Sequence, residues 1–227
     1  MFVSLDEHPK IRLRWATALL LVVMSSVAVW EALLEPAQRG LFIRTWGTVP
    51  SQLFSEQAAD ASLRVFKLFS ALFVHVDTAH LLGNLLFLTL FGFAVEKVFR
   101  SRLVLLLFLT AGVIANLVAA VLLVTRSAPI VGASGAVSGL IGAYLFLFPR
   151  ASMGLVLPLG LYFQFVRVPA LYLIGLWFFL QVLYTVAGPG LSAVAWLAHV
   201  IGFITGFVLA ALLRPLFYRS ARARILN

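Results

Sequence analysis

Six long apolar stretches constrain the fold of this chain more than any other feature of its sequence. A helix of about 20 apolar residues crosses the ~30 Å hydrocarbon core of a lipid bilayer. The stretches cover residues 14–34, 79–99, 102–125, 133–149, 169–187 and 193–213. The sequence therefore predicts an all-α, polytopic membrane protein built as a bundle of six transmembrane helices.

The composition agrees with this class and limits the available chemistry. Hydrophobic residues make up 63% of the 227 residues and charged residues only 11%, whereas soluble domains are roughly half apolar and a quarter charged. The absence of cysteine excludes disulfides, thiolate metal sites and a cysteine nucleophile. The net charge of +9 is spread between the apolar stretches, which argues against a nucleic-acid surface. Oxygen and imidazole groups must therefore carry any chemistry.

Two regions depart from simple spanning helices. The stretch 133–149 is short and ends at Pro149, so its helix should begin below the membrane surface. Residues 35–78 are too mixed to span, and we expect a long interfacial loop with short amphipathic helices. Because no linker or repeat is visible, residues 1–227 are predicted to form a single domain.

The basic residues predict how the bundle is oriented. Cytoplasmic loops carry an excess of Lys and Arg, although long loops such as 35–78 count for less. With a cytoplasmic N-terminus, twelve of the 17 bases fall inside: Lys10, Arg12, Arg14, Lys97, Arg100, Arg102, Arg150, Arg167, Arg214, Arg219, Arg222 and Arg224. Five fall outside: Arg39, Arg44, Arg64, Lys67 and Arg126. Both termini are therefore expected in the cytoplasm.

Polar side chains within the spans are costly in lipid and point to function. These are His80, Asn84, Asn116, Ser134, Ser138, Gln181 and His199. Counted at ~1.5 Å per residue from the nearest cytoplasmic base, Ser134, His199 and His80 lie ~22–25 Å deep. Asn84 lies about one turn from His80 on the same helix face. A serine, two histidines and an amide are thus predicted to share one layer.

Small residues at four-residue spacing explain how this layer could assemble. They follow the serine and the histidine alike, as Gly135, Gly139 and Ala143 on one helix and Gly202, Gly206 and Ala210 on the other. Such faces let membrane helices approach backbone to backbone. Since His199 precedes Gly202 by three residues, close packing would bring its imidazole to Ser134.

A serine paired with a histidine is a candidate catalytic dyad. A neutral imidazole can accept the proton of a serine hydroxyl near pH 7, so we predict Ser134 as nucleophile and His199 as base. Backbone N–H groups at the helix start, with His80 and Asn84, could stabilise an oxyanion. No acid is expected to complete a triad, because Glu96, the only carboxylate expected within a span, lies near the cytoplasmic end.

Each of these features also has a structural alternative. Ser134 could be only a helix N-cap, His199 could be a buried structural histidine, and Gly-xxx-Gly faces occur in ordinary bundles. Three polar groups are expected to form structural hydrogen bonds between helices: Asn116, Ser138 and Gln181. His75 is expected to be a surface or packing residue. The coincidence of type, depth and helix face favours catalysis.

Three segments in this order resemble the rhomboid family of intramembrane serine proteases: HLLGNLLFLTLFGFAVEK, VGASGAVSGLIGAYLFLFPR and AHVIGFITG. The resemblance implies a rhomboid-like bundle and a serine endopeptidase that hydrolyses peptide bonds in or near transmembrane segments. It implies Ser134 as nucleophile and His199 as general base. It further implies that His80 and Asn84, in an HxxxN pattern, hold the oxyanion, and that Glu96 is structural.

The resemblance also implies the setting of the reaction. The expected partners are transmembrane protein substrates and the lipid bilayer. Nucleic acid, metal and cofactor are not expected, because the bases form no patch and the sequence has neither a metal-ligand cluster nor a phosphate-binding loop. The expected location is the cytoplasmic (inner) membrane of a bacterium. One departure is Phe66-Lys67, where the family often has Trp-Arg; it affects how the first outer loop is anchored in lipid rather than the dyad.

Two other classes of protein are alternatives. A noncatalytic rhomboid-like protein that escorts membrane clients would normally lack the serine or the histidine, and both are present here. A small transporter usually has paired broken helices in two related halves, whereas this chain has one recessed helix start and no matching repeat. Cleavage of a transmembrane substrate by the purified protein would separate the three classes.

Overall fold

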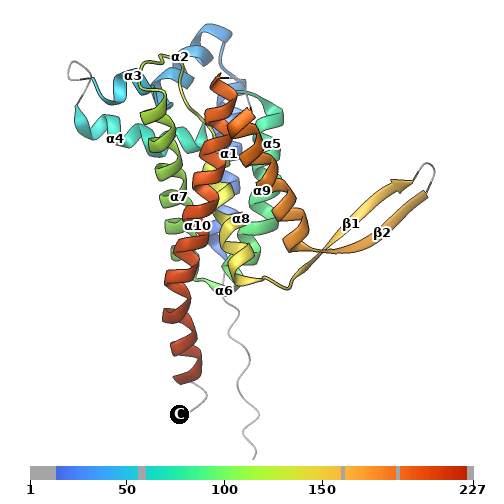
Figure 1. Cartoon of the computed structure of the whole chain (residues 1–227). Helices are drawn as coiled ribbons and strands as arrows, with labels where there is room; N and C mark the ends of the chain where they lie inside the picture. The colour runs from blue at the N-terminus through green and yellow to red at the C-terminus, as the bar shows by residue number, and fades with distance from the viewer. Residues whose placement is uncertain (1–13, 56–59, 160–161, 188–189, 224–227) are drawn as a thin grey trace, which may run out of the picture.

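The computed structural model describes residues 14–55, 60–159, 162–187 and 190–223, so three of the bases used for the orientation, Lys10, Arg12 and Arg224, lie outside the described residues. The elements follow one another as shown in Figure 1: α1 (Trp15–Ala32), α2 (Pro36–Trp46), α3 (Pro50–Leu53), α4 (Ala61–Ser70), η1 (Ala71–Phe73), α5 (Thr78–Phe87), η2 (Leu88–Gly92), α6 (Phe93–Val98), α7 (Ser101–Leu122), α8 (Ser134–Leu147), β1 (Ser152–Leu159), β2 (Tyr162–Pro169), α9 (Ala170–Ala187) and α10 (Gly190–Ala223).

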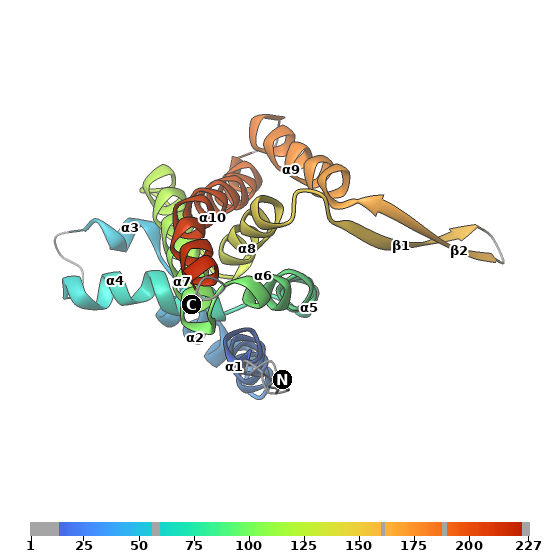
Figure 2. The same cartoon turned by 90° about the horizontal axis from the view of Figure 1, so that it is seen from below.

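The predicted all-α polytopic bundle is confirmed. In the described part of the chain, five helical segments are long and apolar enough to cross a membrane: Trp15–Ala32, Thr78–Val98, Ser101–Leu122, Ala170–Ala187 and Trp196–Pro215. The sixth predicted span is α8, whose 14 residues reach only ~21 Å. It is surrounded by other helices, with α7 and α10 packed against it (Figure 2). The shortest of the six predicted spans therefore occupies the centre of the bundle.

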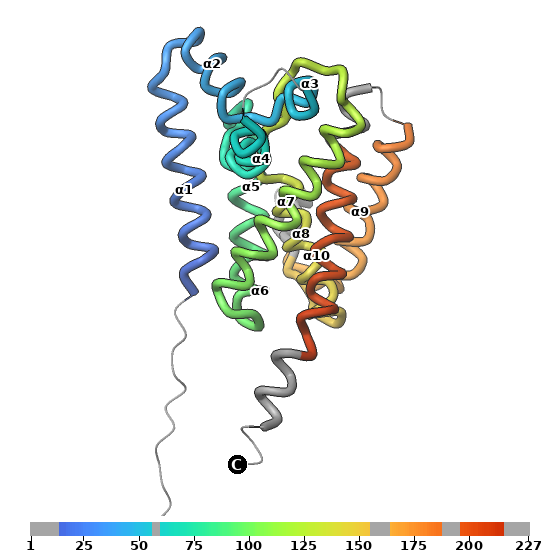
Figure 3. Tube along the Cα trace, turned by 90° about the vertical axis from the view of Figure 1, so that its left-hand side faces the viewer, coloured from blue at the N-terminus to red at the C-terminus, as the bar shows by residue number. Residues whose placement is uncertain are grey.

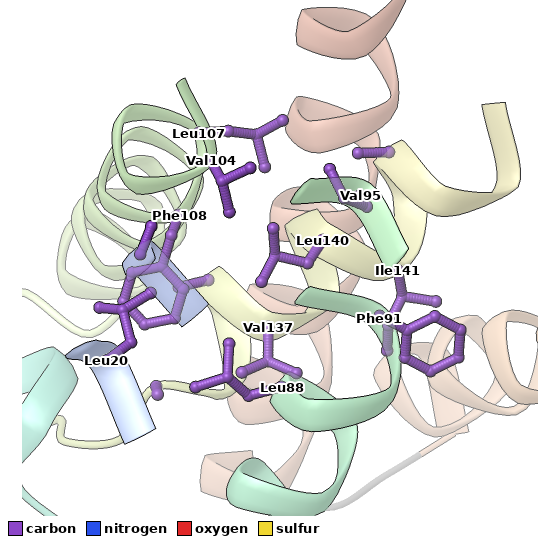
Figure 4. Packing of buried hydrophobic residues seen from close by; sticks show 14 of the residues in the cluster. Leu20, Leu88, Phe91, Val95, Val104, Leu107, Phe108, Val137, Leu140 and Ile141 are labelled. Carbon is purple, nitrogen blue, oxygen red and sulfur yellow. The ribbon is translucent and has the colours of Figure 1, made fainter. Parts of the chain in front are cut away.

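Apolar side chains from several helices fix α8 in this position. Figure 4 shows Val137, Leu140 and Ile141 of α8 surrounded by residues of α1, η2, α6 and α7. Residues 135–143 of α8 are all buried, and six of these nine are glycine, alanine or serine. Small residues on the remaining faces let neighbouring backbones come close, which matters for the site described below.

The start of α1 is fixed by a carboxylate from α6. Glu96 accepts hydrogen bonds from the backbone N–H groups of Ala16 (2.9 Å) and Thr17 (3.0 Å) and from the Thr17 hydroxyl (2.6 Å). These amides belong to the first turn of α1, where a helix has no internal acceptor. Glu96 therefore caps α1, a helix that otherwise lies at the edge of the bundle (Figure 3).

We expect Glu96→Gln to lower the free energy of unfolding by about 1–3 kcal/mol, because the amide loses an acceptor oxygen and leaves a buried donor unpaired. Thermal unfolding in detergent micelles measures the change. Glu35→Gln serves as the control, because Glu35 is the exposed N-cap of α2 and glutamine can still accept its single capping hydrogen bond. An unchanged unfolding temperature for Glu96→Gln would show that the cap contributes nothing to stability.

The segment 35–78 contains α2, α3, α4 and η1 and lies across the outer end of the bundle (Figure 3). Asn116 of α7 holds α4 by donating from Nδ2 to the carbonyl oxygen of Leu68 (3.2 Å), as expected for a structural amide. Phe66 lies edge-on to Trp46 with ring centroids 6.1 Å apart. Phe66 of the Phe66-Lys67 pair thus packs from α4 against α2.

An antiparallel hairpin between α8 and α9 was not predicted from the sequence, in which no element was assigned to residues 150–168. Strand β1 pairs with β2 from Ser152↔Pro169 to Leu159↔Tyr162, and the hairpin projects away from the bundle (Figure 2). In each strand, apolar residues occupy positions on both faces of the hairpin rather than on one. The period-two alternation that identifies a strand is therefore missing.

Candidate active site

The loop before α8 delivers Ser134 as the first residue of the helix. Gly132 has a φ of +114°, a conformation that favours glycine, and its N–H donates to the carbonyl oxygen of Ala71 (2.8 Å). Ala133 is the N-cap, and no side-chain capping hydrogen bond occurs at this helix start. The alternative that Ser134 is only an N-cap is therefore wrong.

Helices α8 and α10 touch backbone to backbone along the predicted small-residue faces. A Cβ atom added to Gly202 would collide with the carbonyl oxygen of Gly135, and one added to Gly206 would collide with that of Gly139. Alanine side chains of α7 close the opposite side of α8, where a Cβ on Gly135 would lie 2.7 Å from the Cβ of Ala115. The α8–α10 seam thus has room for glycine only.

This seam places Ser134 and His199 on adjoining turns. Gly135, which follows the serine, faces Ala198, which precedes the histidine. A Cβ on Gly135 would lie 3.6 Å from the carbonyl oxygen of Ala198. No hydrogen bond between the Ser134 hydroxyl and the His199 ring occurs among the interactions of the described residues. Nucleophile–base hydrogen bonds are often long without substrate, so the lack of this hydrogen bond does not argue against a dyad.

Gln181 of α9 orients His199, a role that was not predicted from the sequence. His199 Nδ1 lies 2.8 Å from Gln181 Oε1. With a carbonyl oxygen as its acceptor, Nδ1 carries the proton and Nε2 keeps the free lone pair that a base needs. Gln181 was expected to be structural. Its depth, counted over the fourteen residues from Arg167 at the helical rise, is ~21 Å, which would have assigned it to the same layer.

Aromatic rings complete the surroundings of His199. Trp196 lies edge-on to the His199 ring with centroids 5.7 Å apart, and Tyr184 of α9 stacks on Trp196 at 5.2 Å. Large planar neighbours restrict the rotation of the imidazole. The histidine is therefore held by one hydrogen bond and by packing between α9 and α10.

His80 and Asn84 lie on α5 beside the loop that leads to Ser134. The His80 ring lies so close to Gly132 that a Cβ there would be 2.9 Å from Nε2. The His80 backbone N–H donates to Asp77 Oδ1 (2.7 Å), which fixes the start of α5. Asn84 is 5% exposed, and its Nδ2 has no hydrogen-bond partner within the part of the chain that the structure describes. A buried donor without an acceptor marks a place where an acceptor can bind.

Two expectations about polar groups are corrected. Ser138 was expected to bond between helices, but its hydroxyl donates to the carbonyl oxygen of Ser134 (2.7 Å) within α8. Glu96 was expected to be the only carboxylate within a span, but Glu31 in the last turn of α1 is also buried, at 3% exposure. The second expectation was wrong because Glu31 lies inside the stretch 14–34.

His75 is a buried residue rather than a surface one. It is 3% exposed, and its ring meets that of His80 edge-on with centroids 5.2 Å apart. Burial, reinforced by the neighbouring His80, lowers the pKa of His75 from 6.5 to about 4. His75 is therefore neutral at pH 7.

Within residues 14–55, 60–159, 162–187 and 190–223, no three His, Cys, Asp or Glu side chains lie close enough together to hold a metal ion. The polar layer therefore consists of a hydroxyl, imidazoles and amides. Such groups suit proton transfer and oxyanion stabilisation.

A comparison with protein families adds independent evidence. The model of the Rhomboid domain matches residues 62–216, more than two thirds of the chain. The match includes α8, the part of α10 that carries His199, and every residue of the polar layer described above. No individual curated protein matches the sequence significantly. Because this match covers more than half of the chain and the helical bundle agrees with it, the chain belongs to the rhomboid family.

Proposed function

We propose that this protein is an intramembrane serine endopeptidase that hydrolyses peptide bonds in or near the transmembrane segments of membrane proteins by a Ser–His dyad. The observation that carries the proposal is the glycine seam between α8 and α10, where Gly135 faces Ala198. These residues are next to Ser134 and His199 in the sequence, which supports the dyad. Membership of a family whose members are typically serine proteases supports it. The substrates would be membrane proteins in the same bilayer.

In the proposed reaction, His199 is the proton carrier. Its Nδ1–H donates to Gln181 Oε1, which leaves Nε2 to accept the proton of the Ser134 hydroxyl. The Ser134 oxygen attacks the scissile carbonyl carbon, and a tetrahedral oxyanion forms. His199 then gives the proton to the leaving amine as the C–N bond breaks. Water, activated by the same Nε2, hydrolyses the acyl-enzyme and restores the serine.

The oxyanion would be stabilised at the start of α8. The backbone N–H of Ser134 lies in the first turn, where it has no acceptor within the helix and the helix dipole is positive. Asn84 Nδ2 is a buried donor without a partner among the described residues, and His80 lies against Gly132. These groups are the proposed donors, because a fixed donor that is unpaired before the reaction can pair with charge as it develops.

The dyad predicts that Ser134 is activated toward electrophiles. A fluorophosphonate probe should label the wild-type chain at Ser134, and the chain has no cysteine to compete. Peptide mapping of the labelled protein by mass spectrometry identifies the modified residue. Labelling that persists in Ser134→Ala would place the nucleophile elsewhere.

We also propose that both termini are cytoplasmic. The proposal rests on the twelve-to-five distribution of bases, and it is supported by the position of α6 and the second half of α10 at the end opposite to α2–α4 (Figure 1). Reporter fusions after Arg150 and at the C-terminus should therefore give a cytoplasmic signal. A fusion near residue 188 should give an exterior signal, and a cytoplasmic one there would overturn the orientation.

A further inference from the structure

A polar cavity lies between the outer end of α1, α2 and the start of α5. Its volume is about 350 Å³, and its polar wall consists of Glu31, Arg39, His75, Asp77 and Thr78. None of these residues belongs to the dyad or to the proposed oxyanion donors. A cavity of this size and polarity can hold several water molecules, each of which occupies about 30 Å³ in the liquid.

Three buried polar atoms at this cavity lack a hydrogen-bond partner among the described residues. They are Oε1 of Glu31 and both ring nitrogens of His75, and each of these residues is only 3% exposed. Leaving such atoms unpaired destabilises the folded protein. Buried water usually bridges two to four polar groups of this kind. The unpaired atoms therefore call for water in the cavity.

The surrounding charges fix the orientation of Glu31. Arg39 donates from Nη2 to the carbonyl oxygen of Val76 (2.8 Å), and the same atom lies 3.9 Å from Glu31 Oε2. The backbone N–H of His75 also faces the Glu31 carboxylate. One oxygen of Glu31 is thus directed toward protein donors, and Oε1 remains for water.

Contacts run from this cavity to the nucleophile. The ring of His75 meets that of His80 edge-on, with centroids 5.2 Å apart and planes at 67°. The His80 ring in turn lies against Gly132, two residues before Ser134. A change in the His75 ring therefore reaches His80 directly.

We propose that this cavity is a hydration site in which water bridges Glu31 to the His75 ring and so positions the His80 ring against Gly132, two residues before Ser134. Glu31 and His75 are positioning residues, since they touch neither the dyad nor the scissile bond. Their effect on catalysis rests on the proposed protease function, whereas the hydration and the state of the histidine rings do not.

Nitrogen-15 NMR of the full chain, labelled on its histidines, tests the hydration site directly. There are only four histidines, so the ring signals of His75 and His80 can be assigned by substitution. His75 should remain neutral between pH 7 and pH 5, because burial and the neighbouring His80 lower its pKa to about 4 against the opposing effects of the Phe73 backbone and Asp77. Glu31 and Arg39 are the other charged residues that line the same cavity. Its ring N–H should show magnetisation transfer from water. An ordinary pKa near 6.5, or the absence of transfer from water, would overturn the proposal.

Two variants test the coupling to His80. Glu31→Gln keeps the shape of the side chain and should shift the ring signals of both His75 and His80. Glu35→Gln, at the exposed N-cap of α2 and outside the cavity lining, should shift neither, because glutamine can still accept the capping hydrogen bond. Ala28→Leu adds apolar volume to the cavity from α1 while leaving every polar side chain of its wall in the sequence, and it should shift the same signals. Unchanged His80 signals in folded Glu31→Gln and Ala28→Leu would refute the positioning role.

The kinetic test distinguishes this proposal from the protease proposal. Glu31→Gln should lower kcat about tenfold with little change in KM, because a displaced donor weakens the transition state rather than substrate binding. Equal losses in Glu31→Gln and Glu35→Gln would argue against a specific role. If wild-type protein cleaves no substrate but its ring signals respond as described, only the protease proposal fails.

Discussion

Replacing Ser134 or His199 by alanine should reduce the cleavage of a transmembrane substrate to the background rate. Ser134→Ala removes the attacking oxygen and His199→Ala removes its base, so the double variant should be no worse than either single variant. The measurement is the initial cleavage rate per folded enzyme in proteoliposomes, with thermal unfolding followed in parallel. Folding should persist, because neither side chain belongs to the apolar core.

Variants elsewhere in the polar layer provide the graded comparison. His80→Ala and Asn84→Ala each remove one proposed oxyanion donor and should lower kcat by roughly 10²–10³. Ser138→Ala should lose less than about tenfold, because its hydroxyl bonds to the carbonyl oxygen of Ser134 within α8. If folded His199→Ala kept substantial activity, the dyad would be wrong and His80 would become the better candidate for the base.

Gly206→Ala should have the second largest effect, although residue 206 lies seven residues, or ~10 Å, from His199 along α10. The added methyl group would collide with the backbone carbonyl of Gly139, which cannot turn aside as a flexible side chain can. The collision should force α10 away from α8 and separate His199 from Ser134. A misplacement of about 1 Å can cost about 10²-fold in rate. Cleavage and fluorophosphonate labelling should therefore both decline by at least about that factor.

The matched control is Gly83→Ala on α5. Gly83 lies between His80 and Asn84, closer to the polar layer in sequence than Gly206 is to His199, but a Cβ there has no neighbour within 4 Å. Alanine should raise helix stability by about 1 kcal/mol and leave the rate unchanged. Equal activities for folded Gly206→Ala and Gly83→Ala would show that the seam does not set the dyad geometry.

The part of the site that could be predicted from the sequence depends on the constant rise of a helix. Counting from the cytoplasmic bases placed Ser134, His199 and His80 in one layer, and the four-residue spacing of glycines identified the two helices that meet. Depth alone gives no rotation about the helix axis. Gln181 was therefore assigned to structure, because only the three-dimensional packing of α9 against α10 brings its amide to the His199 ring.

Other features could not be predicted because their signals are local or absent. Glu31 lies within one turn of the predicted end of its span, where a carboxylate is usually solvated, and only the folding of α2 back over it makes it buried. The β1–β2 hairpin has apolar residues on both faces and so lacks the alternation typical of a strand. The Ser138 hydroxyl bonds to the backbone carbonyl four residues earlier in its own helix, and any serine inside a helix can do the same.

The short central helix also determines when the site can form during synthesis. At 14 residues, α8 is too short to settle across a bilayer alone, and α10, whose backbone packs against its glycines, is made by the ribosome more than fifty residues later. A nascent chain therefore holds its serine without a base. In a cell, the proposed protease would be inert throughout translation and would become active when α10 inserts, with no propeptide needed to protect neighbouring membrane proteins.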